Sequence, residues 1–320
     1  MTSSRSVFAA CIWVLASMLP LVGNAQLAGH NTRGDFGLQS GTQAPPGFYI
    51  APLIYDYRAD TLRDRNGDSR PIFSSGGDID IQAAVFGLLW TSEKKILGAN
   101  YGLGVWPGFT NNALEAPITG VEESTSAGLA DLYLQPVILG WTAPRADFTA
   151  GLGVYAPTGS WELGGAHNRG LGMWSYEVFG GTTVYFDEAK TWHFAMLAAY
   201  ETHGKKDDTD IRAGDLVTLE GGIGKSFRDG TVNIGLSYYA QWKVSRDDVG
   251  SGIGFPNGPL DQKHRVFGFG PEVTLPIAST RTLFGFLTLR YLWETGARST
   301  LEGNTLVASF TFPYPSIPLQ

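Results

Sequence analysis

Connections of two lengths alternate along this chain, and this alternation limits its fold more than any other feature of the sequence. A period of two between apolar and polar residues predicts twelve strands, joined by long and short connections in strict turn. Tight joins such as 187–191 follow long polar ones such as 110–127. The predicted strands are roughly 47–58, 77–90, 97–109, 128–142, 147–157, 173–187, 191–203, 215–227, 230–243, 264–275, 283–294 and 304–312. A soluble sandwich has no reason to sort its loops in this way, so we predict an all-β, up-and-down antiparallel transmembrane β-barrel of about 12 strands.

The lengths and ends of the predicted strands agree with a membrane barrel. Typical strands have about five or six residues, whereas a tilted strand needs roughly 9–11 residues to cross a bilayer. The predicted strands reach or exceed that length. Aromatic girdles at both interfaces are expected of such a barrel. Tryptophans lie near the strand ends, at Trp90, Trp106, Trp141, Trp174, Trp192, Trp242 and Trp293.

The N-terminus predicts export. Arg5 precedes the apolar run "VFAACIWVLASMLPLV", and the small residues Gly23 and Ala25 follow it. This order is typical of a signal peptide, here residues 1–25, cleaved after Ala25. A retained anchor is the alternative. Cys11, the single cysteine, lies within the signal, so the mature chain has no disulfide, thiolate metal site or cysteine nucleophile. The expected location is the bacterial outer membrane.

Charge and hydropathy exclude two classes of protein. Loss of Arg5 leaves 22 basic residues against 30 Asp and Glu, so the mature net charge is −8. A nucleic-acid-binding protein needs a basic face, and we therefore expect no nucleic acid as a partner. No run of 18 apolar residues follows Ala25, which excludes membrane-spanning helices.

The first predicted strand is apolar on both faces. Phe48 and Ile50 lie on one side of it, and Tyr49 and Leu53 on the other. The side that faces outward is expected to meet lipid. Residues 26–46, rich in Gly and Gln, form an irregular periplasmic or lumenal lead before the barrel, which spans 47–312 and is followed by a short tail at 313–320. We predict that residues 35–46 lie in or against the lumen and gate it; the alternative is a disordered periplasmic tail.

Several stretches of the mature chain resemble a known family. They include "GTQAPPGFYIAPLIYDYRADTLRDRNGD", "ADLYLQPVILGW", "GLGVYAPTGSWELGG" and "WHFAMLAAYETHGKKDDTDIRAGDLVTLEGGIGKSF". In order and over nearly the whole mature chain, they are similar to the outer-membrane family named for the meta-pathway of phenol degradation. The resemblance implies an outer-membrane transporter associated with the catabolism of aromatic compounds. It supplies no catalytic or binding residues.

Side chains on the inner face are the candidates for a substrate path. Acids and bases there can line the path or pair across the lumen, and aromatic rings can contact a flat apolar solute or simply pack. Asp78, Asp80, Gln135 and Lys243 are also predicted to point inward. The candidates for the path are Tyr133, Glu177, Phe179, Tyr185, His193, Glu201, Tyr239, Gln241 and Arg290.

The function that these features favour is a channel or transporter for small, hydrophobic or aromatic compounds. A structural or adhesion barrel without transport is one alternative. A hydrolase built from Ser175, His193 and Glu201 is another, but the spacing does not fix their register. We predict no enzyme, no catalytic residue, no cofactor and no metal site. The expected partners are the lipid bilayer, lipopolysaccharide, the barrel assembly machinery and a small hydrophobic solute.

Overall fold

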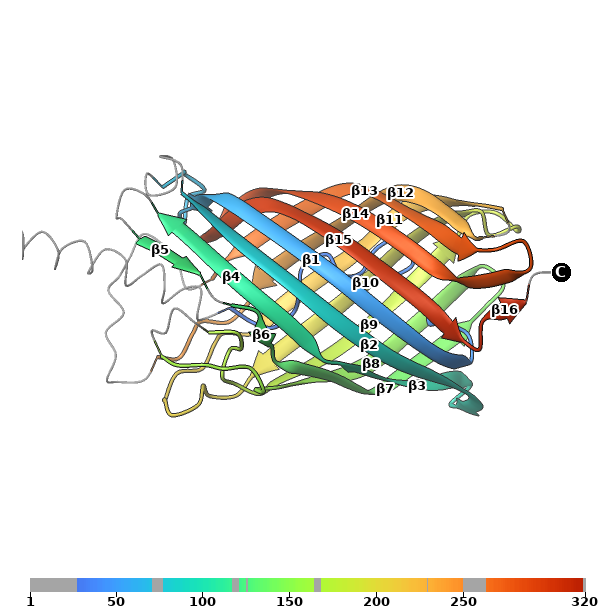
Figure 1. Ribbon diagram of the computed structural model, residues 1–320, viewed down its shortest axis with the longest axis horizontal. Coiled ribbons are helices and arrows are strands. Elements are labelled where there is room, and N and C mark those ends of the chain that lie inside the picture. Colours follow the sequence, from blue (N-terminus) through green and yellow to red (C-terminus); the bar gives the residue numbers. More distant parts are fainter. Residues whose placement is uncertain are drawn as a thin grey trace, which may run out of the picture.

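The computed structural model describes residues 28–70, 77–116, 121–124, 126–163, 168–228, 230–249 and 263–318, and these form one β-barrel (Figure 1). The predicted signal peptide and residues 26–27 lie outside the described residues. The strands are β1 (Gly47–Arg63), β2 (Asp78–Ile96), β3 (Ala99–Trp106), β4 (Gly108–Ala116), β5 (Val121–Ser124), β6 (Gly128–Leu129), β7 (Leu132–Thr142), β8 (Ala146–Ala156), β9 (Ser175–Tyr185), β10 (Trp192–His203), β11 (Leu216–Phe227), β12 (Val232–Lys243), β13 (Arg265–Ala278), β14 (Thr282–Arg298), β15 (Thr300–Tyr314) and β16 (Ile317–Pro318).

The sheet closes on itself with twelve antiparallel wall strands, as the sequence predicts. Each strand from β7 to β15 pairs with its neighbour in the chain, and β1 pairs with both β15 and β2. β3 and β4 act as one wall strand interrupted at Pro107, because both pair with β2. A proline lacks the N–H that a ladder needs, which accounts for the interruption. In the described residues no helix is long and apolar enough to span a membrane.

The two ends of the barrel differ in their connections, although two predicted loops are wrong. The predicted loop 110–127 is largely strand, because β4 continues to Ala116 and β5 pairs with it. Strands β2 and β3 turn at Leu97 and Gly98, both with positive φ, and this end has the short turns. At the other end, which we call the long-loop end, the predicted loop 295–303 is instead a tight hairpin through Ser299. Its Gly, Ser, Thr and charged residues resemble a loop in composition, but Ala297 is buried in an apolar cluster with Tyr239 and Leu292, and both strands continue through this stretch.

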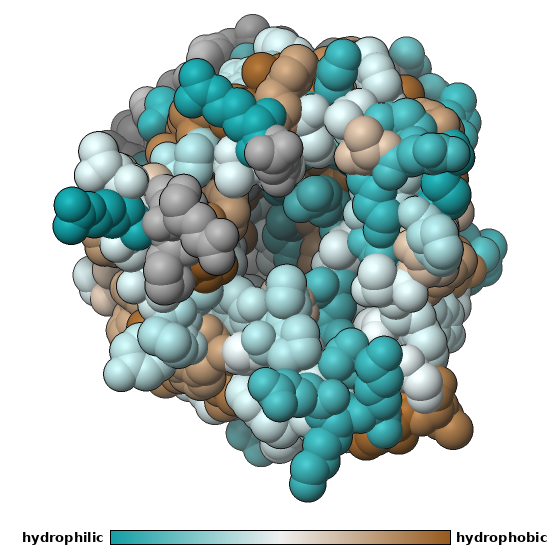
Figure 2. Space-filling model, turned by 90° about the vertical axis from the view of Figure 1, so that its right-hand side faces the viewer, coloured by the Kyte–Doolittle hydropathy of each residue, from teal (hydrophilic) through white to brown (hydrophobic). Residues whose placement is uncertain are grey.

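The outer surface carries the apolar residues that a lipid-facing barrel needs. Phe48, Ile50 and Ile54 of β1 are exposed, whereas Tyr49, Tyr55 and Tyr57 point inward and are buried. The exposed set continues around the wall and includes Phe86, Leu88, Val178, Met196, Ile234, Leu236, Phe269 and Leu289. Viewed from the short-turn end, the barrel mouth is hollowed and has many hydrophilic residues at its rim (Figure 2).

Two predicted inward residues are on the outside. Asp80 pairs in register with Arg58, an exposed residue, and their side chains form an ion pair at 3.5 Å. Asp78, two residues away, shares the outer face. The prediction was wrong because β2 is apolar on both faces near its middle, so alternation did not fix which set of residues points inward.

Residues 28–46 run through the lumen, and we call them the lumenal segment. His30 contacts Ser175, where β9 begins at the long-loop end, while Thr42 contacts Asp147, near the start of β8 at the short-turn end. Wall glycines make room for the segment. A Cβ atom at Gly235 would lie 2.7 Å from the Leu38 side chain, and one at Gly224 would lie 3.1 Å from it.

The lumenal segment and the cavity beside it

Three buried glutamates of the wall bind the backbone of the lumenal segment. Glu201 of β10 accepts hydrogen bonds from the N–H groups of His30 and Asn31, each at 2.8 Å. Glu220 of β11 accepts from two more, those of Gly34 and Phe36, each at 2.9 Å. Irregular backbone inside a barrel has no ladder to satisfy its N–H groups, so buried carboxylates take the place of a strand partner.

The third glutamate lies further along the segment. Glu272 of β13 accepts from the Leu38 N–H at 3.3 Å and pairs with Arg290 of β14 at 2.7 Å. Arg290 in turn donates to the Gly34 carbonyl oxygen at 2.6 Å. The wall therefore binds both donors and acceptors of the segment's backbone on the β10–β14 side of the barrel.

A second arginine comes from the segment itself. Arg33 pairs with the buried Glu294 of β14 at 2.9 Å and lies over the Tyr57 ring at 5.3 Å. The hydroxyls of Tyr57 and Tyr239 also donate to Glu294, at 2.9 and 2.5 Å. A buried carboxylate with an opposite charge and two hydroxyl donors has its polar needs met, which a lone buried charge would not.

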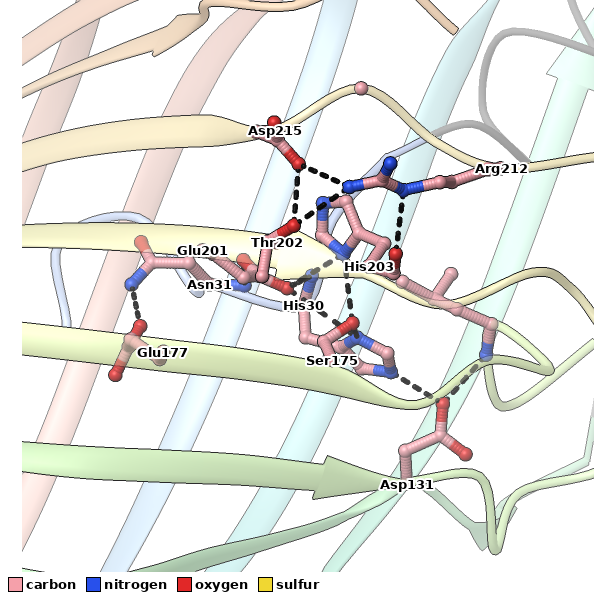
Figure 3. A network of polar contacts seen from close by, with 12 residues as sticks. His30, Asn31, Asp131, Ser175, Glu177, Glu201, Thr202, His203, Arg212 and Asp215 are labelled. Carbon is pink, nitrogen blue, oxygen red and sulfur yellow. Dashed lines mark hydrogen bonds and ion pairs between the residues drawn. The ribbon is translucent and has the colours of Figure 1, made fainter. Parts of the chain in front are cut away.

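Near the long-loop end, His30 joins several wall strands (Figure 3). Its Nε2 lies 2.8 Å from an Asp131 oxygen and its Nδ1 lies 2.8 Å from Ser175 Oγ. Ser175 Oγ is also 2.8 Å from Nδ1 of His203. The His30 ring stacks on Tyr155 with centroids 4.7 Å apart. The segment is therefore fixed here through a side chain as well as through its backbone.

A buried lysine joins two loops beside this cluster. Lys206 donates from Nζ to the Leu171 carbonyl oxygen at 2.5 Å and lies over the Trp161 ring. Burial lowers the pKa of Lys206 to about 8, although Asp131 acts in the opposite direction. Residues 168–174 and 204–214 are thus packed together at this end of the barrel.

On its other side the segment faces an apolar cavity of about 340 Å³. Wall residues of β1, β2 and β3 line it, among them Leu53, Ile81 and Trp106, and Phe36 of the segment lies opposite. Its polar lining includes Asp35, Asp131, Tyr133, Gln135, Tyr155 and Arg169. The size falls within the range of small-molecule sites, and the mixture of apolar walls with a few polar groups is typical of them.

The nine predicted path residues all point into the barrel, but they do not surround one cavity. Tyr133 lines the cavity and donates to Glu177, which also accepts from Asn31. Phe179 packs near Phe36 in an apolar cluster. The others contact the segment or neighbouring wall residues: Tyr185 donates to Asp147 and lies edge-on to His193, Gln241 donates to Asn31, and Glu201, Tyr239 and Arg290 bind as described above.

The suggested hydrolase arrangement is not formed. The register places Ser175 opposite His203, and His193 opposite Tyr185, at the other end of β10. Ser175 is fully buried, as is His193, whose two ring nitrogens have no hydrogen-bond partner among the described residues. The spacing of residues does not determine the register of these strands, so it could not show that His203, rather than His193, lies beside Ser175.

Sequence reasoning missed most of the groups that hold the segment. Glu220, Glu272 and Glu294 lie in strands that alternate clearly. Each shares a strand face with Gly or Thr residues, and this pattern could have placed the glutamates on the inner face. His30 and Arg33 carried no such signal, because an irregular segment has no period.

A solved structure of low sequence identity has the same barrel fold. An outer membrane channel from Pseudomonas putida F1 is similar over 89% of this chain and 100% of its own, with a TM-score of 0.71 and 12% sequence identity. The β domain of the Bordetella autotransporter BrkA is similar over 84% of this chain and 100% of its own, with a TM-score of 0.49 and 10% identity. No curated protein matches. A family model described as "Putative MetA-pathway of phenol degradation" matches residues 59–310, and the chain therefore belongs to that family.

Proposed function

We propose that the barrel carries small hydrophobic, chiefly aromatic, compounds across the outer membrane, and that the lumenal segment controls their passage. The cavity between that segment and β1, β2 and β3 carries the proposal. A flat ring of phenol size would contact Phe36, Leu53 and Trp106 there, and burial of apolar surface is worth about 25 cal/mol per Å². The family's name and its barrel fold are consistent with this substrate class.

The apolar inner face of β1 has a purpose in this proposal. Membrane barrels usually alternate apolar-out with polar-in, but Leu53 and Tyr55 point inward and line the cavity. A solute that water excludes gains nothing from a wide aqueous pore, since its transfer into water is unfavourable. An apolar wall inside the barrel gives such a solute a route on which it is partly shielded from water.

The lumenal segment would have to shift for a solute to pass. It runs from the long-loop end to the short-turn end, and its contacts with Glu201, Glu220 and Glu272 are all on one side. We propose that movement of residues 35–46 opens the route. Cleavage after Ala25, insertion by the barrel assembly machinery and contact with lipopolysaccharide complete the proposed biogenesis.

A substitution that fills the cavity tests the proposal. Ala83 lines the cavity, whereas Ala84, its neighbour in β2, pairs with the exposed Ile54 and faces outward. We expect A83F to lower the initial rate of phenol uptake by intact cells about tenfold, as loss of a ligand-sized contact would. A84F is the matched control and should leave uptake unchanged.

Two outcomes would count against the proposal. If cells without the protein take up phenol as fast as cells with it, the barrel is a structural or adhesion protein. If A83F and A84F behave alike while both give normal heat-modifiable gel mobility, the solute does not pass through this cavity.

A further inference from the structure

We propose that His30, Glu201 and His203 form a binding site for a divalent transition-metal ion of the zinc type, which fastens the lumenal segment to the wall. The three side chains each offer one ligand atom, and these atoms all lie within 4.8 Å of one another. Two come from β10 and one from the segment. The proposal concerns binding of a metal and stands whether or not the barrel transports aromatic compounds.

The two distances from Glu201 to the histidines fit such an ion. Glu201 Oε1 is 3.6 Å from His30 Nδ1 and 3.4 Å from His203 Nδ1. Zinc binds nitrogen and carboxylate oxygen at about 2.0–2.2 Å, and two such ligands on a tetrahedral ion are therefore roughly 3.3–3.5 Å apart. Two imidazoles and one carboxylate are a ligand set that zinc favours.

The groups behind the donors hold them in position. Asp131 lies 2.8 Å from Nε2 of His30, so in neutral His30 that nitrogen carries the proton and Nδ1 presents its lone pair to the cluster. A carboxylate behind a histidine is the usual outer-shell partner of a metal-binding imidazole. Glu201 is oriented in turn by the N–H groups of His30 and Asn31.

His203 can present Nδ1 to the ion without losing a hydrogen bond at its other ring nitrogen. Its side chain is fully buried, and its Nε2 atom has no hydrogen-bond partner among the described residues. Its Nδ1 shares Ser175 Oγ with Nδ1 of His30, each at 2.8 Å. A metal at the centre would replace the contacts to this single hydroxyl. Moving the His203 proton from Nδ1 to Nε2 would break no other bond.

Metal binding to the purified, untagged mature chain is the direct test. Titration with Co²⁺, followed by its absorption spectrum, and competition with Zn²⁺ should give one ion per chain. We expect H30Q and H203Q each to weaken binding more than D131N does, and D131N to weaken it about 10–100-fold, as loss of an outer-shell partner does.

The control lies on the same strand. His193 is a buried, inward histidine at the other end of β10, and H193Q should bind the metal as the wild type does. His30 belongs to the lumenal segment and not to a wall strand, so H30Q tests the site even if H203Q fails to fold. A wild type that binds no ion, or an H30Q variant that binds as tightly as the wild type, would overturn the proposal.

The fastening is measured separately. The mature chain lacks cysteine, so S40C places a single thiol at a buried position of the segment. If the ion holds the segment in place, free metal at about 100 times its dissociation constant should slow maleimide labelling of S40C about 100-fold. The same metal should not slow labelling in S40C/H30Q. Equal rates with and without metal in S40C would overturn the fastening.

Discussion

The two sides of the lumen differ in chemistry. On the β10–β14 side, Glu201, Glu220 and Glu272 are buried and bind N–H groups of the lumenal segment. On the β1–β3 side, Leu53 and Trp106 line a cavity, and hydrogen bonds to the segment are few. The difference shows that the β10–β14 wall binds the backbone of the segment, whereas the β1–β3 wall makes few polar contacts with it. The cavity lies on the side where the wall has few polar groups that need a partner.

Charge explains why the attachment is firm. Hydrogen bonds to charged groups contribute about 1.5–3 kcal/mol each, roughly twice the neutral value. Removal of the segment would also leave buried carboxylates without partners, and such carboxylates are costly. The polar side therefore favours the arrangement of the segment seen in the structure, and the proposed opening would need free energy to break these contacts.

The largest effect should come from removal of the segment. Deletion of 28–44 keeps Pro45, whose carbonyl accepts from Tyr49, and takes away the contacts with both sides. A twelve-stranded barrel lies between the filled eight-stranded ones and the water-filled porins, so its emptied lumen should conduct ions. We expect single-channel conductance to rise at least about tenfold. Unchanged conductance with normal barrel assembly would show that the segment does not close the lumen.

A smaller effect should follow from weakening the polar side. E220Q keeps the shape of the side chain but removes the charge that binds the N–H groups of Gly34 and Phe36. A loss of about 1.5–3 kcal/mol would raise the open population about 10–100-fold. Maleimide labelling of S40C, a buried position in the segment, measures it. E302Q is the matched control, since Glu302 pairs with Arg63 at the rim.

A change on the apolar side should act on the solute rather than on the segment. Ile81 lines the cavity, and I81N places an unpaired amide there. We expect phenol uptake to fall several-fold, because a buried polar group without a partner costs about 1–3 kcal/mol. Labelling of S40C should not change. If I81N instead frees the segment, the two sides are not independent.

The sequence was sufficient for the barrel because its signal is local and repeated. Alternation within each strand and the tight turns predicted the twelve wall strands and the inward direction of residues such as Tyr239 and Arg290. It failed where two faces are alike, as for Asp80, and where pairing between distant segments decides the site. Contacts such as His30 with Asp131 depend on the path of an irregular segment, which has no period to interpret.

The smallest effect should come from the outside of the same wall. Asp80 pairs with Arg58 at 3.5 Å, but the Arg58 side chain is 64% exposed, and exposed ion pairs add little to stability. D80N should therefore leave thermal unfolding, S40C labelling and phenol uptake close to those of the wild type. Asp80 and Ile81 are adjacent in β2, so D80N and I81N change one inner and one outer side chain of a single strand. A large loss of uptake in D80N would mean that the outer face takes part in the route. The difference between the two sides of the lumen would then not be enough to explain transport.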